Sequence, residues 1–189
     1  MTQEVEMAVI DPRVTYRKVE ERLATETDPV LRHNLETVLA HMKAEMAGDV
    51  DGLLATLSDH PVYHAYGSDD PATNPVGRDG VRAFYERFIA SGAGQLQLDV
   101  DRLVVDKDCI LTEGLMRIAY PGRTLQAMGI EVDDADAYYL YEARMATLWP
   151  FDESGKATGE DTYTGGDGFA GIADRKLATG DIVQYAPAS

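Results

Sequence analysis

The chain has 189 residues, 44% of them hydrophobic and 26% charged, which is typical of one globular domain with extensions. Its 17 basic and 33 acidic residues give a net charge of −16, and such a surface repels phosphate backbones and anionic membranes. We therefore expect neither a nucleic acid nor a membrane as partner. The single cysteine, Cys109, excludes an intramolecular disulfide and a paired-cysteine metal site. No signal-like start or long apolar run is present, so a cytoplasmic protein is expected.

Helical patterns dominate the first half of the chain. Residues 1–13 suggest a flexible arm, and residues 15–25 predict a short helix with a thin apolar stripe. Asp28 and Pro29 are typical helix-start residues, and Gly48 is a typical stop. Between them, apolar residues recur at spacings of three and four: Leu31, Leu35, Val38, Met42 and Met46. Asp49 can cap a second, short helix, and residues 80–88 predict a third.

After residue 94 the apolar period changes from helical to strand-like. Strands are predicted at residues 61–66, 96–105, 110–120, 137–149 and 158–164. A tight turn is expected at residues 152–155. Helices followed by a run of strands indicate an α+β fold, with the helices on one side of a curved sheet.

Two motifs carry a family resemblance. The stronger is Ala47-Gly-Asp-Val-Asp-Gly-Leu-Leu54, and the second is Gly-Arg-x-x-Val-x-x-Phe-Tyr at residues 77–85. With a weaker Gly155-Lys156 and Tyr163 pattern, this order resembles the nuclear transport factor 2-like (NTF2-like) superfamily, in particular its SnoaL-like proteins and ketosteroid isomerases. The resemblance spans about residues 30–165.

The resemblance implies a cone-shaped fold of three helices packed on a strongly curved, mainly antiparallel sheet. It places the domain at residues 29–168, with an N-terminal extension at 1–28 that carries a short helix and a C-terminal tail at 169–189. It also implies a cavity between the helices and the concave face of the sheet, and a homodimer formed through the convex face. An apolar cavity of this kind shifts pKa values and strengthens hydrogen bonds to developing charge.

Two histidines are candidate catalytic residues. Counted back from Gly48, His41 occupies the position of the oxyanion-stabilising tyrosine of the ketosteroid isomerases. The general-base aspartate of those enzymes falls on Ala65, which argues against their chemistry. His64 follows Tyr63 as in many SnoaL-like proteins, although strand alternation would turn its side chain to the other face unless the register slips. The alternatives are a half-exposed helix histidine at 41 and a surface or interface histidine at 64.

The strand at residues 137–149 has two faces, of which one is expected to face the cavity or to form core packing. That face contains Tyr139, Tyr141, Ala143, Met145, Thr147 and Trp149. Thr147 maps near the isomerases' second oxyanion donor. Other predicted ligand-binding residues come from the first strand, the third helix and the last strand: Tyr63, Tyr66, Phe84, Phe88 and Tyr163.

Glu113 and Glu160 are the carboxylates predicted to be inside, where either could orient a histidine ring and raise its basicity. The alternative for each is a solvated, outward-facing acid. The acidic segment at residues 133–136 lacks the glycine turn of a calcium loop, and the histidines lack the spacing of a zinc site. We therefore expect no metal and no cofactor.

Two functions remain open on these residues. One is a cofactor-independent acid–base enzyme of dehydratase, isomerase or cyclase type that acts on a small hydrophobic carbonyl- or hydroxyl-bearing molecule. The other is a non-catalytic, dimeric small-ligand-binding protein with the same pocket.

Overall fold

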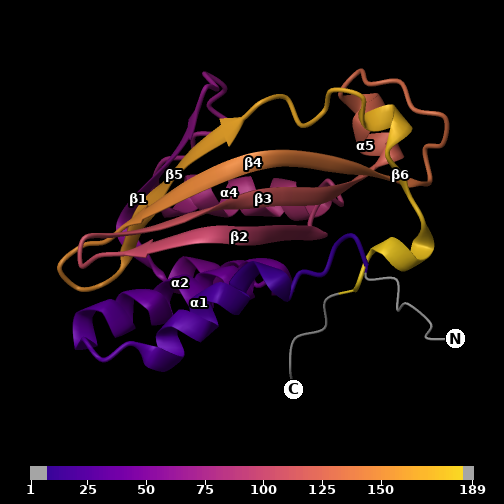
Figure 1. Cartoon of the computed structure of the whole chain (residues 1–189). Coiled ribbons are helices and arrows are strands. Elements are labelled where there is room, and N and C mark those ends of the chain that lie inside the picture. The colour runs from indigo at the N-terminus through magenta and orange to yellow at the C-terminus, as the bar shows by residue number, and fades with distance from the viewer. Residues whose placement is uncertain (1–7, 185–189) are drawn as a thin grey trace, which may run out of the picture.

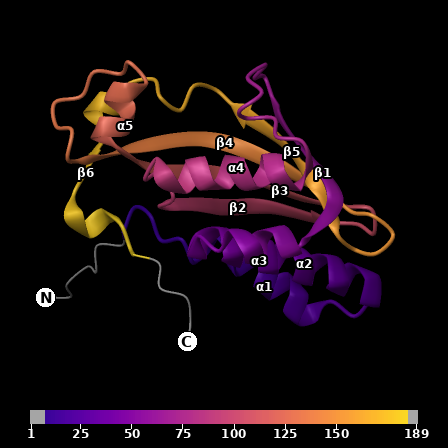
Figure 2. The same cartoon turned by 180° about the vertical axis from the view of Figure 1, so that it is seen from behind.

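A computed structural model describes residues 8–184. Its sheet has the strand order β1-β5-β4-β3-β2, and the helices lie against one face and along the β2 side (Figures 1 and 2). The α+β class is confirmed. The predicted flexible arm is wrong for its described part, because Ile10 is fully buried and forms a bridge with Ile182. The remainder of that arm, and residues 185–189 of the predicted tail, lie outside the described residues.

Local signals explain the helices. In α2 (Pro29–Ala47), the Asp28 carboxylate accepts hydrogen bonds from the Val30 and Leu31 amides, and Gly48 ends the helix with φ of 66°. Asp49 caps α3 (Val50–Ala55) by accepting from the Gly52 amide. Helix α1 (Val14–Thr25) packs against α2 and β2. Helix α4 (Gly77–Ala90) packs against β1, and α5 (Gly122–Ala127) follows β3.

The sheet is antiparallel except at one edge. Strands β2 (Leu96–Val105), β3 (Cys109–Pro121), β4 (Tyr138–Pro150) and β5 (Ala157–Gly165) form consecutive antiparallel pairs, and β6 (Lys176–Leu177) pairs with β4. Strand β1 (Leu57–Tyr66) instead runs parallel to β5, with Tyr63 opposite Glu160. This pairing brings the first and last long strands side by side.

Two glycines permit close backbone contacts where the strand register shifts. A Cβ on Gly114 would lie 2.0 Å from the Asp99 carbonyl oxygen, beside a shift between Val100 and Arg102. A Cβ on Gly159 would lie 1.7 Å from the Val62 carbonyl oxygen. Such irregularities bend a strand, and the bent sheet turns its concave face toward α2 and α4.

No helix within residues 8–184 is long and apolar enough to cross a membrane.

Candidate functional site

A cavity of about 240 Å³ lies between α2, α4 and the inner face of the sheet. Most of its lining is apolar or aromatic, and two carboxyl groups reach it, those of Glu45 and Glu160. The apolar part comes from α4 and from strands β2, β3 and β4: Phe84, Phe88, Leu96, Met116, Ile118 and Met145. A few polar groups in an apolar hollow are the usual composition of a small-molecule site.

Glu160 is the centre of a hydrogen-bonded cluster at the base of this cavity. Its Oε1 lies 3.1 Å from the Tyr85 hydroxyl, which donates to it, and 3.2 Å from His41 Nε2. His41 is fully buried, and its Nδ1 lies 2.7 Å from Thr56 Oγ1. Both neighbours approach the same carboxylate oxygen, so Oε2 of Glu160 is not used by either of them.

The hydrogen-bond inventory indicates which groups of the cluster donate. The Thr56 hydroxyl donates its only proton to the Leu53 carbonyl oxygen at 2.6 Å, so it must accept from His41 Nδ1. His41 Nε2 then carries a proton toward Glu160 only when the imidazole is charged. Nε2 also lies 3.3 Å from the Tyr85 hydroxyl, so His41 joins Thr56, Tyr85 and Glu160 in one buried network.

Glu45 is the second carboxyl group. Burial, followed by the nearby charge of Glu160, raises the pKa of Glu45 to about 8. Its side chain is only partly shielded from solvent, but protein surrounds it closely enough to disfavour the charged form. At neutral pH Glu45 is accordingly mostly protonated and can donate a hydrogen bond.

Two tyrosines complete the polar part of the site. Burial raises the pKa of both Tyr63 and Tyr85 well above the usual value, and the charge of Glu160 adds to this, so both remain neutral donors. The Tyr63 hydroxyl is near Tyr85 and Glu160, yet it is buried with no partner of good hydrogen-bond geometry among the described residues. An unsatisfied buried hydroxyl beside a cavity is available to a ligand.

The structure places some predicted residues at this cavity and not others. Tyr63, Phe84, Phe88, Met145 and Glu160 line it. His41 lies behind Glu160 and Tyr85 and is not part of the lining. Thr147 and Trp149 are on the predicted inner face, but they are buried deeper, where the Trp149 ring packs edge-on against His41 at 5.0 Å.

Several predicted positions are wrong because their side chains are on the outer face of the sheet. Glu113 pairs there with Arg102 and Arg144, and these cations lower its pKa. Tyr66 and Tyr163 stack on each other at 4.4 Å and are about half exposed. His64 borders the cavity, but its imidazole is exposed and contacts Asp161 at 2.6 Å, as strand alternation requires.

Tyr139 and Tyr141 are on the correct face of β4 but at its other end. Tyr139 is buried in a cluster with Leu125 and Ile172, and its hydroxyl donates to Asp133. Tyr141 packs against Phe169. Both are therefore core residues rather than lining of the cavity.

Two residues of the cavity were not among the predicted site residues, Glu45 and Tyr85. Glu45 follows His41 by four residues, and this spacing puts both side chains on one helix face. Tyr85 is in the Gly-Arg-x-x-Val-x-x-Phe-Tyr motif at residues 77–85 and lies next to Phe84 on the same helix. Within residues 8–184, no group of three or more histidine, cysteine or acidic side chains is arranged to hold a metal ion.

Comparisons with known proteins agree with this fold. A family model described as the SnoaL-like domain matches residues 38–137. The chain belongs to the SnoaL-like family. No curated protein matches it in sequence.

Solved structures with a similar fold superpose over most of the chain. One, from Shewanella denitrificans OS-217 and proposed to be a SnoaL-like polyketide cyclase, is 14% identical with a TM-score of 0.59, covering 75% of this chain and 95% of that one. Another is an NTF2-like protein of unknown function from Burkholderia pseudomallei K96243, with 17% identity, a TM-score of 0.55, and coverage of 77% and 98%. A third, the epoxide hydrolase/cyclase-like enzyme SalBIII, is 12% identical with a TM-score of 0.52, covering 70% and 90%. These likenesses establish the NTF2-like fold.

Proposed function

We propose that this SnoaL-like protein is a cofactor-independent acid–base enzyme of cyclase, isomerase or dehydratase type. Its substrate would be a small, largely apolar molecule that carries a carbonyl or hydroxyl group. The observation that carries the proposal is the pair of carboxyl groups, Glu45 and Glu160, in one apolar cavity, with the pKa of Glu45 raised to about 8. Two acids whose environments differ are the usual arrangement for paired acid and base roles.

The roles follow from the surroundings of each group. Glu160, held at Oε1 by His41 and Tyr85, would remove a proton from the carbon next to a substrate carbonyl. Glu45, protonated at neutral pH, would donate to the carbonyl oxygen as negative charge develops there, and the Tyr63 hydroxyl would add a second donor. The enol formed in this way can then cyclise, isomerise or lose a leaving group. His41 acts through Glu160 and is a positioning residue.

The proposal can be tested before the natural substrate is known. 1-Tetralone, a bicyclic aromatic ketone, is incubated with the protein in deuterium oxide, and exchange of the protons next to the carbonyl is followed by NMR. We expect the protein to accelerate exchange and Glu160→Gln to reduce the acceleration about 10²–10⁴-fold. Glu113→Gln is the matched control, because Glu113 is also a strand carboxylate but lies on the outer face.

The alternative, a non-catalytic and dimeric ligand-binding protein, is favoured by one observation, the mostly apolar lining of the cavity. It predicts that 1-tetralone binds, as measured by calorimetry, while exchange proceeds at the rate of the buffer. That result, or equal exchange by wild type and Glu160→Gln, would overturn the acid–base proposal.

A further inference from the structure

A second hollow of about 350 Å³ lies on the other side of Glu45. It is bounded by the end of α2, by α3, by α4 and by the segment that leads into β2. Three residues, Glu45, Tyr85 and Phe88, line both hollows. The second hollow is therefore adjacent to the catalytic cavity and shares its proposed general acid.

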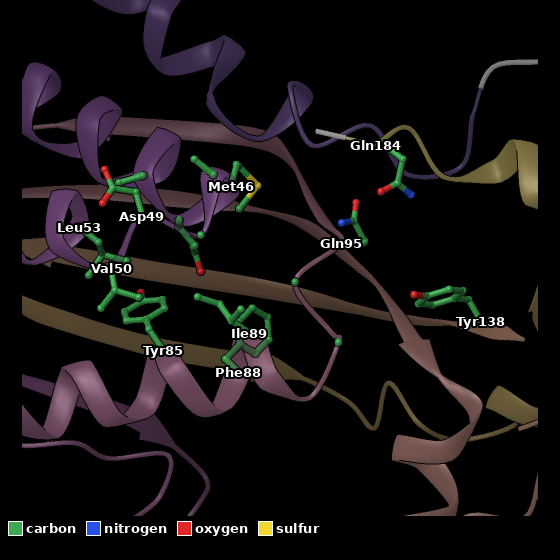
Figure 3. A pocket seen from close by; sticks show the side chains of 16 residues that line it. Met46, Asp49, Val50, Leu53, Tyr85, Phe88, Ile89, Gln95, Tyr138 and Gln184 are labelled. Atoms are coloured by element: carbon green, nitrogen blue, oxygen red, sulfur yellow. The ribbon is translucent and has the colours of Figure 1, made fainter. Parts of the chain in front are cut away.

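Polar groups lie at both ends of the second hollow (Figure 3). Asp49 lies beside Leu53 and Val50 toward one end, while Gln95 and Gln184 lie toward the other. Gln95 Oε1 is buried and has no hydrogen-bond partner within residues 8–184. A buried acceptor without a partner is costly, so a ligand that supplies a donor at this point gains affinity.

The charge of the lining limits what can bind. No lysine or arginine among the described residues lines either hollow. An anionic group would lie near the Asp49 carboxylate without a compensating cation, in a protein of net charge −16. A neutral donor such as a hydroxyl or an amide N–H fits the lining better.

We propose that the two hollows are two compartments of one binding site and that Gln95 selects the substrate. The reacting carbonyl lies in the first compartment, and a neutral arm of the substrate extends past Glu45 and donates a hydrogen bond to Gln95 Oε1. The preferred substrate is thus an elongated, uncharged molecule with a hydroxyl or amide donor remote from its carbonyl. This inference rests on the proposed function for the position of the carbonyl.

The test uses three 1-tetralones that carry a short alkoxy arm on the aromatic ring, ending in a hydroxyl, a methyl or a carboxylate. Calorimetry is expected to rank hydroxyl above methyl by about tenfold, the size of one hydrogen bond, with carboxylate weakest. Gln95→Leu removes the acceptor and should reduce the hydroxyl-to-methyl ratio to about one. Gln126→Leu, on the exposed surface of α5, is the matched control and should keep the ratio.

A second variant tests the compartment itself. A Cβ on Gly94 meets no atom within 4 Å and its φ is not in the left-handed region, so Gly94→Phe can fill the hollow without distorting the backbone. It should remove the affinity that the hydroxyl arm adds over unsubstituted 1-tetralone. Retention of that added affinity, or a hydroxyl preference that survives Gln95→Leu, would overturn the two-compartment proposal.

Proton exchange measured in the same samples separates the two proposals. If the protein catalyses exchange but binds all three arms equally, the acid–base function is supported and the second compartment is contradicted. If the protein prefers the hydroxyl arm through Gln95 but catalyses no exchange, the second compartment is supported and the acid–base function is contradicted.

Discussion

At the scale of single residues, the raised pKa of Glu45 makes the stability of the folded protein depend on pH. This pKa is about 8 in the folded protein and near the ordinary glutamate value of 4.5 when unfolded, so between these pH values the folded state holds a proton that the unfolded state has released. Stability from this group is therefore complete below about pH 4.5 and is lost as the pH rises to about 8. The variant Glu45→Gln has no carboxyl group to titrate at this position, so it should not lose this stability as the pH rises.

The change can be measured by urea unfolding at about pH 5 and about pH 9. We expect Glu45→Gln to be close to wild type at the lower pH and more stable by about 2–4 kcal/mol at the higher one, since water in the two hollows reduces the full effect. Glu113→Gln should instead be less stable than wild type at both pH values, because Arg144 and Arg102 lower the pKa of Glu113 and both pH values lie above its ordinary pKa of 4.5, where the stability that it provides is present. Equal stability of Glu45→Gln and wild type at pH 9 would contradict the assignment.

The two predicted histidines should differ sharply when removed. His41→Ala leaves a cavity between Trp149 and Tyr85 and removes a buried hydrogen-bond partner of Thr56 and Glu160, so a loss of about 3–5 kcal/mol is expected. His64→Ala removes an exposed ring from the outer face and should cost about 0.5 kcal/mol or less. Unfolding free energies at neutral pH provide the comparison, and similar losses for the two variants would argue against the buried network around His41.

At the scale of elements, the sequence predicted those features that depend on neighbouring residues, such as helix ends and the faces of a strand. Asp28, Pro29 and Gly48 set the bounds of α2, and alternation correctly grouped the side chains that share the inner face of β4. Alternation could not say which part of that face lines a cavity, because this depends on where α2 and α4 cross the sheet. For the same reason Tyr139 was misplaced. His41, Tyr85 and Glu160 come from two helices and the last long strand. Their contact depends on tertiary packing, so residue spacing along the chain cannot predict it.

The bend of the sheet gives a prediction at this scale. Gly159→Ala would place a Cβ against the Val62 carbonyl, and Gly114→Ala would place one against Asp99, so each must shift a strand. Losses of about 2–4 kcal/mol are expected for both. Gly180→Ala, where a Cβ meets nothing within 4 Å, should be nearly neutral. Thermal unfolding of the three variants tests this, and a neutral Gly159→Ala would show that β1 can move away from β5 without cost.

At the scale of the whole molecule, residues 8–28, which precede α2, are part of the packed structure. Val19 is fully buried between α2 and the sheet, the Thr15 hydroxyl accepts from the Leu98 amide at 3.1 Å, and the Asp11 amide donates to Gln97 Oε1 at 2.7 Å. These contacts hold the start of β2, the strand that leads from Gln95 and the second hollow. A chain that begins at residue 27 would therefore expose core surface and loosen the proposed second compartment.

Removal of residues 1–26 should consequently lower the free energy of unfolding by several kcal/mol, or abolish cooperative unfolding, rather than leave an intact domain. Val19→Ala in the full-length chain is the milder variant and should cost about 1–3 kcal/mol, since it removes two buried methyl groups while every hydrogen bond of the segment remains. Urea unfolding followed by tryptophan fluorescence suits both, because Trp149 belongs to the same buried cluster as Val19. A truncated chain with wild-type stability would contradict this prediction. It would show that α1 does not stabilise the domain and that residues 29–168 fold without it.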